Sequence, residues 1–287
     1  MASSNPTQAQ GNNRLPHVKN VVCVASGKGG VGKSTVASNL ALALAQDGQR
    51  VGLLDADIYG PSMPTMLGMV DARPTASEDG QGIAPIIAHG IKVMSMGFMM
   101  NTDDAVVWRG PMLGKALQQF IDDVDWGELD VLVLDMPPGT GDVQLSLAQL
   151  LPVSGAVVVT TPQDVAFADV RRALKMLTTT RTPVLGLVEN MSHFVCGDCG
   201  TEHHLFGASR IDSHASEHGL DVLAKIPLDS VTAVSADAGE PIVVAQPESD
   251  PAKLYKALAE TLLNVLNAKT PEPKPEEKFS SFFKMQS

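Results

Sequence analysis

Short apolar runs alternate with longer amphipathic stretches along most of this chain of 287 residues. Helical patterns lie between most of the runs, and this alternation predicts an α/β fold with a mostly parallel sheet and helices on both faces. In such a fold, ligands bind at the carboxyl ends of the strands, so polar residues that follow the runs are the first candidates for a site. The apolar runs occupy residues 20–25, 50–54, 91–94, 131–134, 156–159, 184–188 and 221–226.

The two ends of the chain differ in composition from the part between them. Residues 1–18 are rich in Ser, Asn, Gln, Pro and Gly, so we expect a disordered N-terminal arm. Residues 19–267 carry the alternating pattern and form one predicted domain, which ends in a helix over residues 251–267. Residues 268–287 predict a disordered tail, and its phenylalanines at 279, 282 and 283 leave a short docking segment as the alternative.

A glycine-rich loop follows the first apolar run and precedes a helical pattern over residues 36–44. It matches the G-x-x-x-x-G-K-[ST] phosphate-binding loop and has an extra lysine after its first glycine. Backbone N–H groups of such a loop turn toward the phosphates, Lys33 reaches the β and γ oxygens, and the Ser34 hydroxyl binds Mg²⁺. The loop therefore predicts a site for ATP and Mg²⁺. Its residues are Gly27, Lys28, Gly29, Gly30, Val31, Gly32, Lys33, Ser34 and Thr35.

Three aspartates follow predicted strands and complete the expected nucleotide site. Asp55 and Asp57 come directly after the second apolar run, and Asp135 ends the fourth. Asp55 and Asp135 are predicted to hold Mg²⁺, with Asp135 as a Walker B aspartate. Asp57 is predicted to orient a water molecule, while Lys28 and Lys33 neutralise the γ-phosphate. No acceptor site for a kinase reaction is evident, so these residues predict ATP hydrolysis.

The charge of the chain argues against two classes of partner. Its formal net charge is −11, and only 4% of its residues are aromatic. An acidic surface disfavours binding to nucleic acid and to anionic membranes, so neither is expected as a partner. No apolar run is long enough to cross a membrane, and the polar first residues show no signal-peptide pattern. We therefore expect a cytoplasmic protein.

Cysteines are few, and two of them are close in sequence. Cys23 lies inside the first apolar run, where a buried and inert thiol is expected. Cys196 and Cys199 form a C-x-x-C pair, which in a cytosolic chain suggests metal binding or a thioredoxin-like redox pair. A [4Fe–4S] cluster or a structural zinc ion needs four ligands, so one chain is two ligands short. A symmetric dimer would supply four thiolates, whereas His203 and His204 would complete a zinc site within one chain.

Further motifs give the chain a specific resemblance to known proteins. They are Asp55-Ala56-Asp57-Ile58-Tyr59-Gly60-Pro61-Ser62, Trp108-Arg109-Gly110-Pro111, Asp135-Met136-Pro137-Pro138-Gly139-Thr140-Gly141-Asp142, Val188-Glu189-Asn190-Met191-Ser192 and Cys196-x-x-Cys199. The loop with its early lysine resembles the deviant Walker A group of P-loop ATPases, which includes ParA, MinD, the nitrogenase iron protein and the tail-anchored-protein targeting ATPases. Within that group, the ordered set of motifs resembles the Mrp/ApbC family of iron–sulfur carriers over about residues 19–265.

The resemblance implies a homodimer in which Lys28 reaches the nucleotide of the partner. It also implies that Asp57 orients the attacking water and that Asn190 contacts adenine. Cys196 and Cys199 of both subunits would then hold one bridging [4Fe–4S] cluster, which the protein delivers to apo iron–sulfur proteins. The implied activity is slow ATP hydrolysis in the service of cluster transfer.

Other members of the deviant Walker A group provide alternative functions. A MinD- or ParA-like positioning ATPase needs a basic DNA-binding face or a basic amphipathic membrane helix, and the C-terminal tail has neither. A tail-anchored-protein targeting ATPase has support only from the methionines of residues 94–100, which we expect to pack in the core or a loop. The chain also departs from the family pattern, with Ala208-Ser209-Arg210 in place of a glycine pair and Thr232 where an arginine is frequent.

Overall fold

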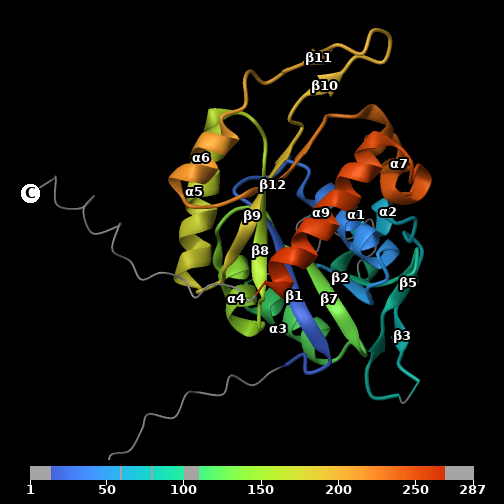
Figure 1. The fold of residues 1–287 in the computed structure, drawn as a ribbon. Coiled ribbons are helices and arrows are strands. Elements are labelled where there is room, and N and C mark those ends of the chain that lie inside the picture. The colour runs from blue at the N-terminus through green and yellow to red at the C-terminus, as the bar shows by residue number, and fades with distance from the viewer. Residues whose placement is uncertain (1–13, 59, 79, 100–109, 269–287) are drawn as a thin grey trace, which may run out of the picture.

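The computed structural model describes residues 14–58, 60–78, 80–99 and 110–268, and their centre is an eight-stranded sheet (Figure 1). The strand order is β12-β9-β8-β1-β7-β2-β6-β5. Every strand predicted from an apolar run is present, and neighbouring strands are parallel except for β5 and β6. The predicted α/β fold is confirmed. The strands are β1 (Val18–Ser26), β2 (Val51–Asp55), β5 (Ile86–Ala88), β6 (Ile91–Ser95), β7 (Leu129–Asp135), β8 (Gly155–Thr160), β9 (Val184–Asn190) and β12 (Val222–Ile226).

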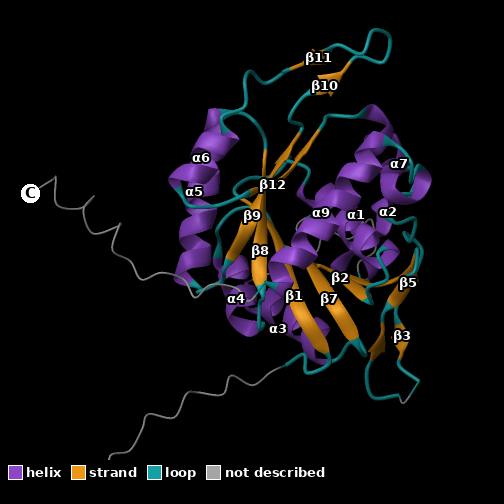
Figure 2. Cartoon of the chain, in the orientation of Figure 1, coloured by secondary structure: helices purple, strands orange, loops and turns teal. Residues whose placement is uncertain are grey.

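Helices cover both faces of the sheet (Figure 2). One face carries α1, α8 and α9, and the other carries α3, α4 and α5. The predicted helices at 36–44 and 251–267 correspond to α1 and α9, which pack on each other. None of the helices in the described ranges is long and apolar enough to span a bilayer. The helices are α1 (Lys33–Gln46), α2 (Met63–Met66), α3 (Gly110–Asp122), α4 (Asp142–Leu150), α5 (Asp164–Thr179), α6 (Ile211–Glu217), α7 (Ser230–Asp237), α8 (Ile242–Ala245) and α9 (Asp250–Asn267), with a 3₁₀ turn η1 at Met96–Phe98.

Several short strands were not predicted from the sequence. The edge strand β5 pairs antiparallel with β6 through a tight turn. Two small hairpins also form, one from β3 (Thr75–Ala76) and β4 (Ile83–Ala84), the other from β10 (Phe194–Val195) and β11 (Glu202–His203). Strands of two or three residues are too short to show the alternation of apolar and polar positions by which strands are recognised.

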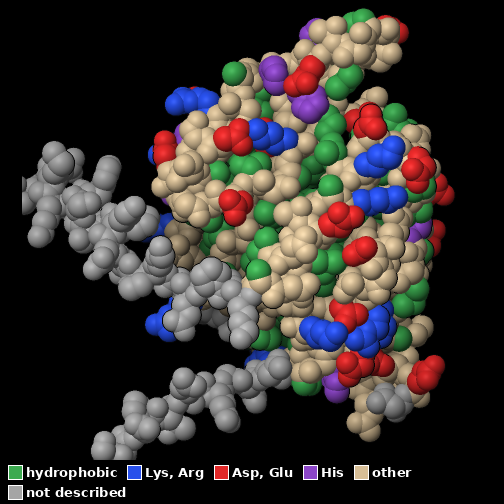
Figure 3. Space-filling view, viewed as in Figure 1, with side chains coloured by type: hydrophobic (Ala, Val, Ile, Leu, Met, Phe, Trp, Pro, Cys, Tyr) green, Lys and Arg blue, Asp and Glu red, His purple; other side chains and the backbone are tan. Residues whose placement is uncertain are grey.

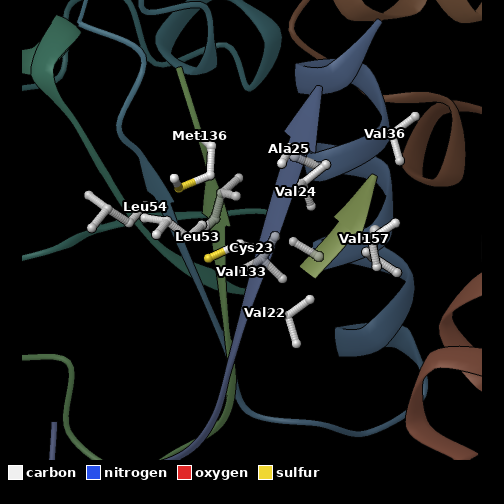
Figure 4. Close-up of a cluster of buried hydrophobic side chains, with 14 of the residues drawn as sticks. Val22, Cys23, Val24, Ala25, Val36, Leu53, Leu54, Val133, Met136 and Val157 are labelled. Atoms are coloured by element: carbon white, nitrogen blue, oxygen red, sulfur yellow. The ribbon is translucent and has the colours of Figure 1, made fainter. Parts of the chain in front are cut away.

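The hydrophobic core is built around β1, which lies between β7 and β8. Cys23 of β1 sits among aliphatic side chains of neighbouring strands, including Leu53, Val133 and Val157 (Figure 4). Burial raises the pKa of the Cys23 thiol to about 12. The thiol therefore stays protonated at neutral pH, which disfavours reaction. The predicted burial of Cys23 is confirmed.

Part of the expected N-terminal arm is packed on the domain. Leu15 is only 4% exposed and belongs to the core, because it offers an apolar side chain that the sheet can bury. Arg14 Nη1 donates a hydrogen bond to Asp122 Oδ2 of α3 at 2.6 Å. The ordered domain thus includes residues 14–18, ahead of the predicted boundary at Lys19. Residues 1–13 and the predicted tail from residue 269 lie outside the described residues.

The methionine-rich segment contributes to the core, as expected. Met94 and Met96 are buried, the first in β6 and the second in η1. Met99 is exposed, and Met100 lies outside the described residues. The two buried side chains give no surface for a client protein.

Tyr255 provides a test of the packing of α9. Its side chain is fully buried, and its hydroxyl has no hydrogen-bond partner among the described residues. A buried hydroxyl without a partner costs stability, so Tyr255→Phe is expected to raise the free energy of unfolding by about 1 kcal/mol. Tyr255→Ala leaves a cavity and is expected to lower it by about 3–5 kcal/mol. Urea denaturation measures both changes, and a less stable Tyr255→Phe variant would contradict this packing.

Candidate functional site

The phosphate loop connects β1 to α1 at the carboxyl edge of the sheet. Gly30 and Gly32 have φ angles of 78° and 77°, a region that favours glycine. Gly29 and Gly30 are exposed at the tip of the loop. A Cβ atom at Gly27 would lie 2.3 Å from the backbone carbonyl carbon of Asp169 in α5, so a larger residue does not fit there. The predicted loop is thus open at its tip and held tightly against α5 at its start.

Side chains tie the first turn of α1 to the end of β7. Lys33 Nζ donates a hydrogen bond to Asp135 Oδ1, and Ser34 Oγ donates to Asp135 Oδ2 at 2.6 Å. Lys33 Nζ also lies 3.2 Å from Ser34 Oγ and 3.9 Å from Asp57 Oδ2. The structure therefore brings together the lysine, the serine and two of the three aspartates that the sequence assigned to one site.

The paired charges at this contact are buried. Lys33 is 6% exposed and Asp135 is 0% exposed. Burial raises the pKa of the Asp135 carboxyl, and the Lys33 ammonium and the Ser34 hydroxyl offset part of that rise. In nucleotide sites Mg²⁺ is held by one or two carboxylates together with phosphate oxygens. The oxygens of Ser34 and Asp135 fit that donor set, with Asp135 as the carboxylate.

Asp55 has a different environment, although it lies opposite Asp135 in the adjacent strand. Its Oδ2 accepts hydrogen bonds from Ser95 Oγ at 2.9 Å and from the Met63 N–H at 3.2 Å. Its Oδ1 accepts a hydrogen bond from the Asp57 N–H at 3.1 Å. Burial and the nearby Asp135 raise the pKa of Asp55 to about 7. Both carboxylate oxygens of Asp55 therefore accept hydrogen bonds from the protein, and one of these bonds fixes the backbone of Asp57. A direct contact between Asp55 and Mg²⁺ remains a prediction.

The loop after Asp135 lies beside the phosphate loop. The Gly139 N–H donates to the Ser26 carbonyl oxygen at 3.0 Å, while Ser26 Oγ donates to the Lys28 carbonyl oxygen at 2.9 Å. Gln144 Nε2 of α4 donates to the carbonyl oxygens of the two prolines before it, at 3.3 and 2.6 Å. These contacts join the two loops at Ser26, and Lys28 is half-buried next to them.

Asn190 ends β9 and touches the phosphate loop. Its Nδ2 donates a hydrogen bond to the Val31 carbonyl oxygen at 2.9 Å, and the side chain is 6% exposed. A Cβ atom at Gly32 would lie 2.1 Å from Asn190 Nδ2, so the loop and the amide are in close contact. The structure thus places Asn190 at the nucleotide loop, while its predicted contact with adenine remains a prediction.

Cys196 and Cys199 lie in the turn of the β10–β11 hairpin, which projects from the carboxyl edge of the sheet (Figure 1). The Cys196 N–H donates to the Thr201 carbonyl oxygen at 2.9 Å, and the Gly200 N–H donates to the Cys196 carbonyl oxygen at 2.8 Å. Cys199 is exposed, and its Sγ donates to Thr201 Oγ1 at 3.2 Å. The contact with Thr201, and then that with Cys196, lowers the pKa of the Cys199 thiol. An exposed thiol of lowered pKa is suited to binding a metal.

The alternative zinc ligands have other neighbours in the hairpin. The ring of His203 lies 6.5 Å from that of Phe194, and His204 Nε2 lies 3.3 Å from Glu202 Oε1. Histidine and acidic side chains gather at the base of the projecting hairpin (Figure 3). Across the part of the chain that the structure describes, no group of three or more His, Cys, Asp and Glu side chains is arranged to hold a metal ion. The zinc site within one chain is therefore not formed in these residues.

Exposed apolar side chains share this end of the molecule. Three lie near the two cysteines in sequence, one is the second residue of α5, which follows β8, and two lie on α7, which follows β12. Single exposed apolar residues are ordinary, and only a contiguous exposed patch would mark a surface for another protein. The residues are Val165, Val195, Leu205, Phe206, Val231 and Val234.

Sequence reasoning missed several residues that shape the site. Ser95, which holds Asp55, directly follows a predicted strand, so the rule that found the aspartates applies to it too. Ser209 stands where the family pattern has glycine, and its Oγ donates to Glu189 Oε1 at 2.5 Å. No pattern in the sequence indicated a role for Thr201. The motif residues Trp108 and Arg109 lie outside the described residues.

Known proteins resemble this chain over most of its length. A family model described as "ParA: NUBPL iron-transfer P-loop NTPase" matches residues 17–263. The iron–sulfur cluster carrier protein of Aquifex aeolicus is 49% identical over 257 residues, which is 89% of this chain and 70% of that protein. Its counterpart in Deinococcus radiodurans is 53% identical, covering 92% of this chain and 74% of that protein. The Escherichia coli K12 protein is 51% identical, covering 85% and 66% respectively.

Solved structures agree with this relationship. A nucleotide-binding protein from Archaeoglobus fulgidus, solved in complex with ADP and with cobalt, has a TM-score of 0.73 and 38% identity, covering 84% of this chain and 94% of that chain. The cell division ATPase MinD of Pyrococcus furiosus has a TM-score of 0.64 at 23% identity, covering 86% and 99%, and shows the shared fold. Because the family model and the closely similar carriers cover most of the chain, the protein belongs to the ParA family of P-loop NTPases, in its NUBPL iron-transfer group.

Proposed function

We propose that the protein is an ATP-hydrolysing carrier that binds a [4Fe–4S] cluster between two copies of the chain and delivers it to apo iron–sulfur proteins in the cytoplasm. The position of Cys196 and Cys199 carries this proposal, because their hairpin projects from the same sheet edge as the phosphate loop. The phosphate loop and the two thiols, of which Cys199 is exposed and Cys196 half-buried, thus share one end of the molecule. Carrier proteins at 49–53% identity support iron–sulfur cargo as the substrate.

The nucleotide chemistry follows from the contacts of Lys33. In the structure its ammonium group is paired with Asp135, and the phosphates of ATP compete for the same donor. Once on the phosphates, Lys33 would neutralise charge on the β and γ oxygens, and Asp57, whose Oδ2 lies 3.9 Å from Lys33 Nζ, would orient water for attack on the γ-phosphorus. Bound through Ser34 and Asp135, Mg²⁺ would supply further positive charge at the phosphates.

The cluster chemistry follows from the number of thiols. A [4Fe–4S] cluster is held by four thiolates, and each chain offers two on an exposed hairpin. Two chains related by a two-fold axis supply the remaining ligands. The exposed apolar residues around the hairpin, on α5 and on α7 support an association at this end. In that dimer Lys28 would reach the nucleotide of the partner.

Cluster loading tests the cysteine assignment. After anaerobic reconstitution with iron and sulfide, the wild-type protein is expected to hold about four iron and four sulfide per dimer. A Cys196→Ala/Cys199→Ala double variant is expected to hold none, whereas Cys23→Ala should load normally because that thiol is buried. Iron and sulfide analysis, together with the molecular mass of the loaded species, gives the cluster content per dimer. Normal loading by the double variant would contradict the bridging site.

The buried lysine gives a second test. Lys33→Ala removes a phosphate contact and is expected to lower ATP turnover by roughly 10²-fold or more. Lys175→Ala, a change at an exposed position of α5, is the matched control and should leave turnover unchanged. Phosphate release measures the rates, and a Lys33→Ala protein with wild-type turnover contradicts the proposed role.

A mixing experiment tests whether Lys28 acts on the partner's nucleotide. Lys28→Ala and Lys33→Ala proteins are each expected to hydrolyse ATP poorly when assayed alone. In a mixed dimer, the Lys28→Ala subunit keeps Lys33 and receives Lys28 from its partner, so one complete site forms and turnover partly recovers. If Lys28 acts only within its own subunit, no mixed dimer has a complete site, and the absence of recovery would refute the trans role.

A further inference from the structure

The last two residues of β9 contact two segments that are far apart in sequence. Successive side chains of a strand point in opposite directions, so Glu189 and Asn190 face different neighbours. Asn190 Nδ2 donates to the Val31 carbonyl oxygen of the phosphate loop at 2.9 Å. Glu189 Oε1 accepts a hydrogen bond from Ser209 Oγ at 2.5 Å. Ser209 follows the cysteine hairpin, so adjacent residues of one strand connect the two functional segments.

The phosphate loop packs closely against the end of β9. Any Cβ atom at Gly32 would lie 2.1 Å from Asn190 Nδ2 and 3.8 Å from the Met191 methyl carbon. Met191, the residue after β9, has a φ angle of 56°, an unusual value for a residue other than glycine. A shift of the loop toward β9 therefore has to displace Asn190 and the strained residue that leads into the hairpin.

The hairpin is attached to the domain at both of its ends. At its start, the Ser192 N–H and Oγ both donate to the Ile226 carbonyl oxygen of β12, at 2.9 and 3.1 Å. The Leu228 N–H donates to the His193 carbonyl oxygen at 2.7 Å. At its far end, Ser209 donates a hydrogen bond to Glu189, and the next residue, Arg210, donates through Nη1 to Asp164 Oδ2 of α5 at 3.3 Å. Cys196 and Cys199 lie between these two attachments.

The carboxylate of Glu189 has only part of its hydrogen-bonding capacity filled. The side chain is 1% exposed, and within the described ranges its Oε2 is buried without a hydrogen-bond partner. A carboxylate can accept several hydrogen bonds, so Glu189 has the capacity to take a different or an additional donor when the segment near Ser209 shifts. An under-satisfied buried group of this kind is suited to two alternative arrangements.

We propose that Glu189 and Asn190 act together as the coupling element between the phosphate loop and the cysteine hairpin, with Ser209 as the positioning residue at the hairpin's far end. This inference rests on the proposed function, in which nucleotide enters the loop and the thiols hold the cluster. Phosphate binding moves the Val31 carbonyl, Asn190 follows it, and the end of β9 transmits the displacement through Glu189 to Ser209. The spacing and exposure of Cys196 and Cys199 then differ between nucleotide states, which is the differential contact that coupling requires.

Thiol reactivity in the cluster-free protein tests this coupling without iron. The alkylation of Cys196 and Cys199 by iodoacetamide is followed by peptide mass spectrometry, with and without saturating Mg-ADP or a non-hydrolysable Mg-ATP analogue. Buried Cys23 reports whether the protein stays folded. We expect nucleotide to change the alkylation rate of the cysteine pair by about fivefold or more in the wild-type protein.

Variants at Ser209 test whether the coupling passes through its hydrogen bond to Glu189. Ser209→Ala should bind nucleotide with unchanged affinity but lose the nucleotide effect on alkylation, because it lacks the hydroxyl that reaches Glu189. Ser209→Thr keeps a hydroxyl and should restore the effect, and Ser216→Ala, at an exposed serine of α6, should behave as wild type. Glu189→Gln, which retains an oxygen acceptor for Ser209, should keep part of the effect.

Each outcome bears on the proposal. A full nucleotide effect in Ser209→Ala overturns the path through Glu189, and wild-type protein that binds nucleotide without any change in alkylation overturns the coupling. Loading of Ser209→Ala with iron and sulfide distinguishes this result from a failure of the proposed function. Normal loading with lost coupling leaves the carrier function intact, whereas wild-type protein that binds neither nucleotide nor cluster overturns both.

Discussion

The site depends on one buried contact, in which Lys33 and Ser34 at the start of α1 meet Asp135 at the end of β7. A buried lysine and a buried aspartate are each unfavourable alone, and breaking such a pair costs about 3–5 kcal/mol. Because β7 lies between β1 and β2, the contact fixes the phosphate loop that leaves β1 relative to the acidic segment that leaves β2. In the proposed function the nucleotide phosphates take the same lysine, so ATP would displace the interaction that builds the site.

The carboxyl edge of the sheet also explains why two kinds of chemistry occur together. Parallel strands end at one edge, so the phosphate loop after β1, the aspartates after β2 and β7, and the cysteine hairpin after β9 all lie there. Each chain presents two thiols on this hairpin, which is half of the ligand set that the proposed cluster needs, and Val195, Leu205 and Phe206 near them in sequence are exposed. Association of two chains at this edge would complete the thiolate set and bring the nucleotide sites to the interface.

Much of this arrangement could be predicted from the sequence, because it follows from where strands end. Asp57 and Asp135 follow apolar runs, and the sheet brings both to Lys33. The pairing of Glu189 with Ser209 could not be predicted, since it depends on loop conformation and not on periodicity. Asn190 shows the intermediate case: its place at the nucleotide edge follows from the strand pattern, but its contact with the backbone of Val31 required the structure.

In the proposed carrier, nucleotide at the phosphate loop controls the cluster held by Cys196 and Cys199. The most direct measurement is the rate at which reconstituted protein transfers its cluster to an apo iron–sulfur enzyme, followed by recovery of that enzyme's activity, with and without Mg-ATP. We expect transfer to occur and Mg-ATP to change its rate, and we expect Lys33→Ala to lose that change. Transfer at one and the same rate in all of these conditions would contradict this expectation.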